Sequence, residues 1–178
     1  MKKFNIPHNF EFTSIITLYA QRISEGRLKI NSDWNKDLGI KFTCQDPCNI
    51  VRKTWGEEMA KDLRYVIKAI VGEENFIDMV PCGTNNYCCG GGGGALQGGY
   101  PEQRRAYGKV KFDQVMATGA QYVLAPCHNC HAQIEDIGEH YGGSYHVAHI
   151  WTFMCLALGV LGENERAYLG PDLQDFGL

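Results

Sequence analysis

Residues 121–142, QYVLAPCHNCHAQIEDIGEHYG, predict a short buried strand that passes directly into a helix. The run 121–126 contains tyrosine, valine and leucine, which favour strands, and it ends at Pro126. The stretch that follows has the polar and apolar residues of a helix. Cys127 and Cys130 stand where the strand gives way to the helix. This segment therefore predicts a βα unit with two thiols at its turn.

The same alternation continues on both sides of this unit. Further strands are predicted at 40–44, 76–81 and 144–150, and helices at 11–27, 56–72, 102–119 and in the apolar run after 150. Strands that alternate with helices are typical of a parallel sheet with right-handed crossovers. We expect an α/β fold with three layers: a mainly parallel sheet of about four strands with helices on both faces. Residues 1–39 are expected to form a helical segment that packs on a cysteine-bearing domain, 40–178.

Composition excludes several classes of function. The 178 residues suffice for the core of one domain, and the net charge of −3 gives no basic footprint for nucleic acid. No apolar run reaches the length of a membrane span, and the first residues do not form a signal peptide. We therefore expect a cytoplasmic protein without a direct membrane span. In such a chain, eight cysteines indicate metal or redox chemistry more than disulfides.

Five of the cysteines fall at or just after the carboxyl end of a predicted strand. These five, called the motif cysteines below, are Cys48, Cys88, Cys89, Cys127 and Cys130. Ligands of open α/β sheets bind at that edge, so the fold would bring the five together. The glycines 90–94 permit a sharp bend and close approach of the backbone after the adjacent pair. Thiolates suit iron and zinc alike, but five exceed the four of a tetrahedral zinc site, which favours iron.

The three other cysteines fit this pattern less well. Cys155 lies in the apolar run WTFMCLALGVL and is expected to pack as a small hydrophobe. Cys44 precedes the Asp46-Pro47 turn, and Cys82 precedes the cysteine pair by several residues. None of the three is expected to bind the metal.

The motif cysteines lie in stretches that resemble a known family. The stretches are DPCNIVRK (46–53), NNYCCGGGGG (85–94), RRAYGKVKFDQ (104–114), APCHNCHAQ (125–133) and NERAYLGPDL (164–173). They resemble the cysteine-rich CCG domain of the B and D subunits of heterodisulfide reductases and of glycolate-oxidase iron–sulfur subunits. The resemblance covers about residues 40–173 and is strongest to the C-terminal domain of the HdrD-like DsrK subunit of dissimilatory sulfur metabolism.

The resemblance implies a cofactor and a reaction. It implies a noncubane [4Fe-4S] cluster held by the motif cysteines, and an oxidoreductase that cleaves a disulfide or trisulfide with electrons delivered singly. It also implies partners: a DsrC-like protein or another disulfide as substrate, and electron-donating iron–sulfur or membrane subunits. Such a complex would hold the chain at the periphery of the inner membrane. No further cluster motif occurs in this sequence, so electrons would come from outside the chain.

Three alternatives remain open at this point. In the first, the chain is a zinc-binding structural or interaction module in which the cysteines only hold the fold. In the second, it is a metal-free dithiol oxidoreductase that uses Cys127 and Cys130 alone. The stretch 127–131, CHNCH, also has the haem c attachment pattern, which the lack of an export signal disfavours. The colour of the anaerobically purified protein separates iron–sulfur, haem and the two colourless alternatives.

Several basic residues and histidines lie near the motif cysteines in the sequence. His128, His131 and Lys109 are candidates for groups that surround the cluster, and His149 and Arg52 are lesser ones. The helix after the glycines carries Arg104, Arg105, Lys109 and Lys111. Most of these four are expected on a solvated helix face, with one or two available to neutralise an anionic cluster.

Overall fold

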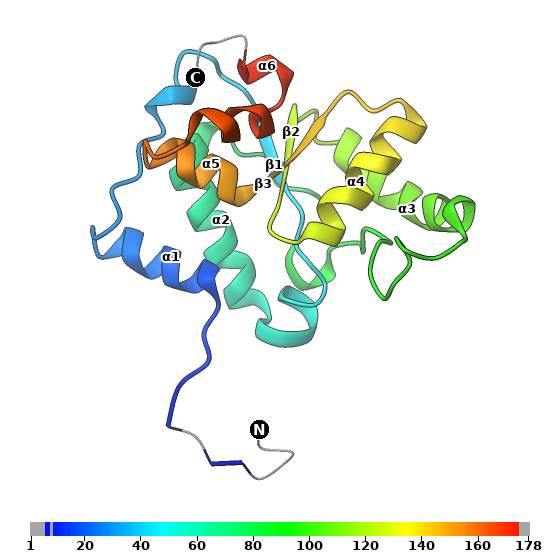
Figure 1. Ribbon diagram of the computed structural model, residues 1–178, viewed down its shortest axis with the longest axis horizontal. Coiled ribbons are helices and arrows are strands. Elements are labelled where there is room, and N and C mark those ends of the chain that lie inside the picture. The colour runs from blue at the N-terminus through cyan, green and yellow to red at the C-terminus, as the bar shows by residue number, and fades with distance from the viewer. Residues whose placement is uncertain (1–5, 8, 175–178) are drawn as a thin grey trace.

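The computed structural model describes residues 6–7 and 9–174, and in these residues three parallel strands form one sheet (Figure 1). The strands are β1 (Phe42–Cys44), β2 (Tyr122–Ala125) and β3 (His146–His149). They pair in the order β1-β2-β3, so β2 is central and has a parallel neighbour on each side. The parallel α/β organisation predicted from the sequence is confirmed.

Helices flank this sheet. The α-helices are α1 (Ile15–Ser24), α2 (Glu57–Val71), α3 (Pro101–Met116), α4 (His128–Tyr141), α5 (Ile150–Ala157) and α6 (Pro171–Gln174). Shorter helical turns are η2 (Asp33–Asn35), η3 (Val51–Trp55), η4 (Glu73–Asn75), η5 (Gly83–Asn85) and η6 (Glu163–Leu169). In Figure 1, α1, α2 and α5 lie to one side of the strands, and α3 and α4 lie to the other. No helix among the described residues is both long and apolar enough to cross a membrane.

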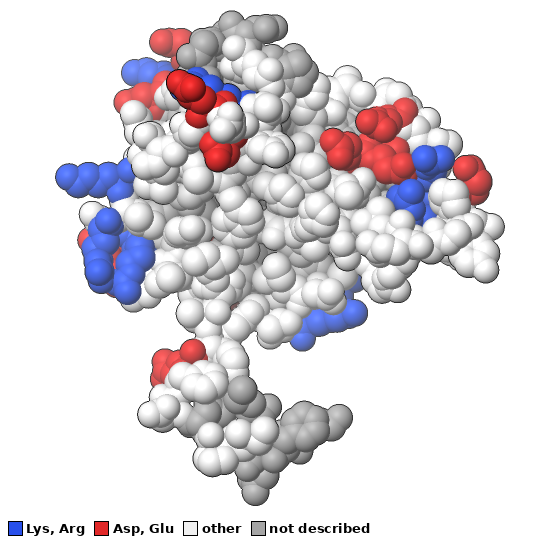
Figure 2. All heavy atoms as spheres, viewed as in Figure 1, with Lys and Arg blue, Asp and Glu red and all other residues white. Residues whose placement is uncertain are grey.

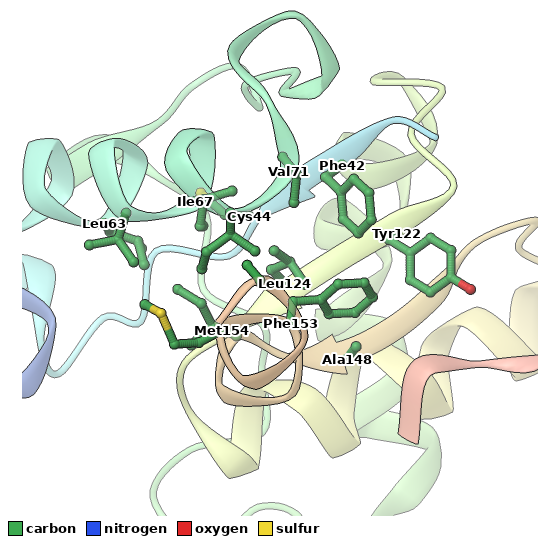
Figure 3. Close-up of a cluster of buried hydrophobic side chains, with 14 of the residues drawn as sticks. Phe42, Cys44, Leu63, Ile67, Val71, Tyr122, Leu124, Ala148, Phe153 and Met154 are labelled. Carbon is green, nitrogen blue, oxygen red and sulfur yellow. The ribbon is translucent and has the colours of Figure 1, made fainter. Parts of the chain in front are cut away.

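Two separate hydrophobic clusters cover the sheet because successive residues of a strand face opposite sides. The larger cluster joins Phe42, Tyr122 and Leu124 to α1, α2 and α5. Figure 3 shows its centre, in which Leu63 and Ile67 of α2 approach the strand residues. The smaller cluster forms on the opposite face from the intervening strand residues together with α3 and α4. The members of the smaller cluster that come from β2 and β3 are Val123, Ala125 and Val147.

The predicted strand 76–81 does not form, which makes the sheet one strand smaller than expected. Only a single bridge joins Phe76 to Phe42, where the Ile77 N–H donates to the Phe42 carbonyl at 2.8 Å. Beyond this bridge the chain leaves the sheet edge. Asp78 accepts two hydrogen bonds from the guanidinium of Arg64 on α2, at 2.6 and 2.8 Å, and Pro81 has no N–H to donate to a ladder. The apolar pattern of residues 76–81 predicted a strand because it contains no sign of this pairing of Asp78 with Arg64.

Candidate metal centre

The turn after β1 is anchored by a buried carboxylate. Asp46 is 3% exposed and accepts two hydrogen bonds, both of 2.8 Å, from the Arg64 guanidinium. It also accepts from the Gly83 N–H at 2.8 Å and from the Asn86 side-chain amide at 3.3 Å. Bidentate pairs of this kind are strong and fix orientation as well as distance. Asp46 therefore joins the turn after β1, helix α2 and the loop that leads to the cysteine pair.

A second set of hydrogen bonds joins the segment of Cys48 to the segment of Cys88. Arg52, in η3, donates from Nε to the Thr84 carbonyl at 2.8 Å and from Nη2 to the Asn86 carbonyl. Arg52 follows Cys48 by four residues, and Asn86 precedes Cys88 by two. Because carbonyl oxygens accept its donors, Arg52 holds these two loops together.

The glycines after the cysteine pair direct backbone N–H groups at its sulfurs. The Gly90 N–H donates to Cys88 Sγ at 3.4 Å, and the Gly91 N–H donates to Cys89 Sγ at 3.5 Å. Gly90 has a φ of +89°, a conformation that side chains disfavour. Hydrogen bonds to cysteine sulfurs stabilise the thiolate and help to set the potential of iron–sulfur clusters.

The glycine turn also lies against the first turns of α4 with no space for a side chain. A Cβ atom added to Gly91 would lie 2.7 Å from Gln133 Cβ and 2.8 Å from the Asn129 carbonyl oxygen. Neither atom is the end of a flexible chain. This close approach brings Cys89 to the helix that carries Cys130.

Four motif cysteines form a continuous row of thiols. The Sγ atoms of Cys89 and Cys130 are 3.4 Å apart. Cys88 hydrogen-bonds with Cys89 at one end, and Cys127 hydrogen-bonds with Cys130 at the other. The fifth, Cys48, lies near enough to Cys88 to contribute to the raised pKa of the Cys88 thiol. The fold thus joins thiols that lie up to 42 residues apart, from 88 to 130, at the carboxyl edge of the sheet.

Hydrogen bonding within this row lowers the pKa of two of the four thiols and raises the pKa of the other two. The Cys130 thiol lowers the pKa of Cys127 to about 6, against the effect of burial and with help from the backbone N–H groups of Cys130 and Asn129. Hydrogen bonds from Cys130 and Cys88 lower the pKa of Cys89. In return, the pKa values of Cys130 and Cys88 are raised. The row therefore favours thiolates at Cys127 and Cys89.

The donor set fits an iron–sulfur cluster better than a single ion. Within the described residues, no three or more His, Cys, Asp or Glu side chains could hold one metal ion as they stand. Instead, the thiols of Cys89 and Cys130 hydrogen-bond to each other at 3.4 Å. Thiolates are, however, the ligands of iron–sulfur clusters, in which different cysteines bind different iron atoms. The N–H groups of Gly90 and Gly91 that point at sulfur add to this fit.

Lys111 is buried, which corrects the expectation of a solvated helix face. Its side chain is 0% exposed, and its Nζ donates to Asn86 Oδ1 at 2.7 Å, to Gln114 Oε1 and to Met79 Sδ at 3.5 Å. Burial lowers its pKa to about 8, while the charges of Asp46 and nearby cysteines act in the opposite direction. Spacings of three and four residues place Lys111 on one side of α3 with other buried residues, a pattern that could have revealed it.

The other basic residues of α3 connect it to α4 or lie at the surface. Arg104 is largely buried, again unlike a solvated residue, and donates to Asp136 at 2.9 Å. Arg105 binds the same carboxylate through two hydrogen bonds of 3.0 and 2.9 Å. Lys109 pairs with Asp113 and lies over the ring of Phe112, 5.2 Å from its centroid. These contacts join α3 to α4 and leave Lys109 among surface partners.

The histidines near the motif cysteines stack on one another. The rings of His131 and His149 are 4.4 Å apart and nearly parallel, and His128 and His149 stack at 5.8 Å. Burial lowers the pKa of His131 and of His149, and the neighbouring imidazoles add to the effect. The three rings line a cavity of about 790 Å³ between α4, β3, α5 and η6. On the face that Figure 2 shows, Lys, Arg, Asp and Glu gather toward the margins and leave the centre without charged groups.

The three other cysteines lie in different surroundings. Cys44 is fully buried in the larger hydrophobic cluster, where Figure 3 shows it near Ile67 and Leu124, and burial raises the pKa of its thiol well above the ordinary value. Cys82 is exposed, and Cys155 is half-buried on α5. None of them hydrogen-bonds with the row of four thiols.

Comparison with known proteins shows the family to which this chain belongs. The family model described as the cysteine-rich domain, CCG, matches residues 42–135, more than half of the chain. An uncharacterized iron–sulfur protein of Methanococcus maripaludis is 34% identical over 118 residues, which cover 64% of this chain and 22% of that protein. The chain thus spans about a fifth of the length of this relative. From the family match and the array of motif cysteines, we conclude that the chain belongs to the cysteine-rich CCG domain family.

Proposed function

We propose that this chain is an iron–sulfur redox domain that reduces a disulfide or trisulfide, in the manner of a heterodisulfide reductase. The row of thiols from Cys88 to Cys127 supports the proposal, because it groups the thiols of distant segments at one sheet edge, where they could serve as ligands. The iron–sulfur relative and the family match support it. We further propose a noncubane [4Fe-4S] cluster with all five motif cysteines as ligands.

The residues around the thiols would prepare the site for such a cluster. Bound there, the cluster would supply electrons one at a time. The N–H groups of Gly90 and Gly91 would donate to the cysteine sulfurs and favour the thiolate forms. Asp46 and Arg52 would hold the loops of Cys48 and Cys88 at a fixed separation.

Stoichiometry defines what the domain needs from its partners. Reduction of a disulfide to two thiols consumes two electrons and two protons, so an outside one-electron donor must act twice. We propose iron–sulfur or membrane subunits as this donor, in a cytoplasmic complex at the periphery of the inner membrane. The proposed substrate is a protein disulfide or trisulfide, such as the two-cysteine arm of a DsrC-like protein in dissimilatory sulfur metabolism.

The cofactor is tested first. The protein is purified and reconstituted without oxygen, and iron, sulfide and zinc are measured per chain together with the visible absorption. We expect broad brown absorption with iron and sulfide in similar amounts. Cys82→Ser is the matched control, since Cys82 is exposed and lies apart from the row of thiols. A colourless protein that retains stoichiometric zinc would contradict the proposal.

The reaction is tested on protein that has passed the first test. The reconstituted protein is mixed with a limiting one-electron reductant and a disulfide of a DsrC-like protein, and the free thiols and the EPR spectrum are recorded. We expect release of thiols and a paramagnetic signal that depends on the disulfide. An intact cluster that yields neither thiols nor this signal would leave a binding or structural role as the better account.

One observation favours a second candidate, a metal-free dithiol oxidoreductase. Cys127 is the N-cap of α4, and its pKa of about 6 is that of a reactive thiol in a C-x-x-C pair. This candidate needs Cys127 and Cys130 but neither Cys88 nor Cys89. If the double variant Cys88→Ser, Cys89→Ser loses iron but retains full disulfide reduction, the second candidate replaces the first.

A further inference from the structure

Lys111 is a buried cation whose hydrogen-bond acceptors carry no charge. The hydrogen-bond acceptors of its Nζ among the described residues are two side-chain amides and a thioether, those of Asn86, Gln114 and Met79. The side chain is completely removed from solvent. A buried ammonium is very unfavourable unless an opposite charge compensates it. The fold must therefore place a negative charge within its reach.

Two sources of negative charge act on Lys111. Asp46 has the largest effect, followed by Cys89, with Cys44 and Cys130 behind them. Asp46, however, already forms a bidentate pair with Arg64, at 2.8 and 2.8 Å. Of the cysteines, Cys44 belongs to the cluster on the other face of the sheet. Because Arg64 also pairs with Asp78, the three groups together keep one negative charge, and the motif thiols Cys89 and Cys130 are the second negative charge that acts on Lys111.

The packing around Lys111 leads to the same thiols. Met79, whose sulfur accepts from Nζ, belongs to the same buried cluster as Cys89 and Cys130. Asn86, the acceptor at 2.7 Å, precedes the cysteine pair by two residues. Both contacts tie the ammonium to the structure that holds the thiols.

We propose that Lys111 is the fixed counter-charge of the motif cysteines and raises the reduction potential of the cluster that they hold. The proposal rests on the iron–sulfur cluster of the proposed function and does not depend on the substrate. A cluster becomes more negative when it accepts an electron, so a nearby cation stabilises the reduced form. The effect is strong in a buried setting, where charges are screened little by solvent or salt.

The expected effect is a shift in redox equilibrium. Lys111→Met should lower the ratio of reduced to oxidised cluster at a fixed potential about tenfold, which corresponds to ~59 mV for a one-electron couple. Lys111→Arg, which retains the charge, should keep the midpoint potential close to that of the wild type. Lys109→Met is the matched control: Lys109 lies on the same helix, but its side chain is 43% exposed and pairs with Asp113, so its removal should leave the potential unchanged.

The experiment is a redox titration of the reconstituted full chain, followed by visible absorption and EPR. It is performed at low and high salt, and the iron content of each variant is measured first. A more negative midpoint for Lys111→Met at both salt concentrations, with Lys111→Arg near the wild type, supports the proposal. An unchanged midpoint for Lys111→Met with its cluster intact overturns it and makes the lysine a structural partner of Asp46.

Two further outcomes are decisive. Lys111→Gln is a second neutral variant that can retain hydrogen bonds to Asn86 and Gln114. If neither Lys111→Met nor Lys111→Gln folds while Lys111→Arg does, the charge serves folding and the inference is wrong. If the wild-type chain binds no iron, the proposed function fails and this inference fails with it, whereas a cluster whose potential ignores Lys111 refutes the inference alone.

Discussion

The contact between the glycine turn and α4 gives the sharpest prediction for stability. In Gly91→Ala, the new Cβ would lie 2.7 Å from Gln133 Cβ and 2.8 Å from the Asn129 carbonyl oxygen. Both distances are shorter than folded proteins tolerate, and both neighbours belong to or adjoin the backbone of a helix. The turn or the helix must therefore move.

The magnitude follows from two opposing effects. Overpacking of this kind destabilises proteins by about 1–3 kcal/mol. Alanine also restricts the unfolded chain, which offsets about 0.4–1 kcal/mol of that loss. We expect a net loss of about 1–2 kcal/mol, which for a chain of this size lowers Tm by about 2–8 °C.

Gly92→Ala is the matched control on the neighbouring residue. A Cβ on Gly92 would meet no atom within 4 Å, and Gly92 does not have a positive φ. We expect this variant to equal or exceed the wild type in stability by up to about 1 kcal/mol. Thermal and urea unfolding of the metal-free chain under reducing conditions measure both variants. Equal stability of the two alanine variants would refute the close approach of this turn to α4.

Three other predictions concern the thiols and the buried ion pair. Serine in place of any motif cysteine should lower the iron bound per reconstituted chain, whereas serine at the three other cysteines should not; equal losses would require a different ligand set. In the metal-free protein, the alkylation rate of Cys127 should rise with pH through about 6, since the reactive thiolate forms above the pKa. At pH 7, Cys127 should be alkylated faster than the more exposed Cys82, because burial raises the pKa of Cys82. Peptide mass spectrometry measures both rates, and faster alkylation of Cys82 would contradict this reasoning. Arg64→Leu leaves Asp46 buried without its cation and should destabilise the fold by about 3–5 kcal/mol in urea unfolding. Arg105→Leu, which breaks the more exposed pair of Arg105 with Asp136, should cost under about 1 kcal/mol. Similar losses for the two variants would contradict the argument from burial.

Elements with strong local signals could be predicted from the sequence. The predicted strand 121–126 and helix 127–142 appear as β2 and α4 within two residues at each end, because β-branched and aromatic residues, Pro126 and Gly142 mark their limits locally. The segment 76–81 has a similar apolar pattern but fails as a strand. Its outcome depends on Arg64, which is distant in sequence and binds Asp78. Tertiary contacts of this kind override local preference.

The candidate site was predictable to the extent that topology determines it. Parallel strands end at the same edge, so the grouping of the cysteines after β1 and β2 could be anticipated. The hydrogen-bond partners of Asp46 and Lys111 could not, because they lie far along the chain: Arg64 for the first, Asn86 for the second. A lysine on a helix is ordinarily solvated, and only its position among buried neighbours on α3 indicated otherwise.

The division of the hydrophobic residues between the two faces of the sheet affects how this domain can evolve. The larger cluster, with α1, α2 and α5, contains none of the motif cysteines, whereas Cys89 and Cys130 are built into the smaller one with α3 and α4. Substitutions that do not share partners act nearly independently. The chain can therefore accumulate stabilising changes around Phe42 and Leu63 while the thiol-bearing side keeps its geometry. Such a reserve of stability on one face would let the other face tolerate new substrates or new partner subunits.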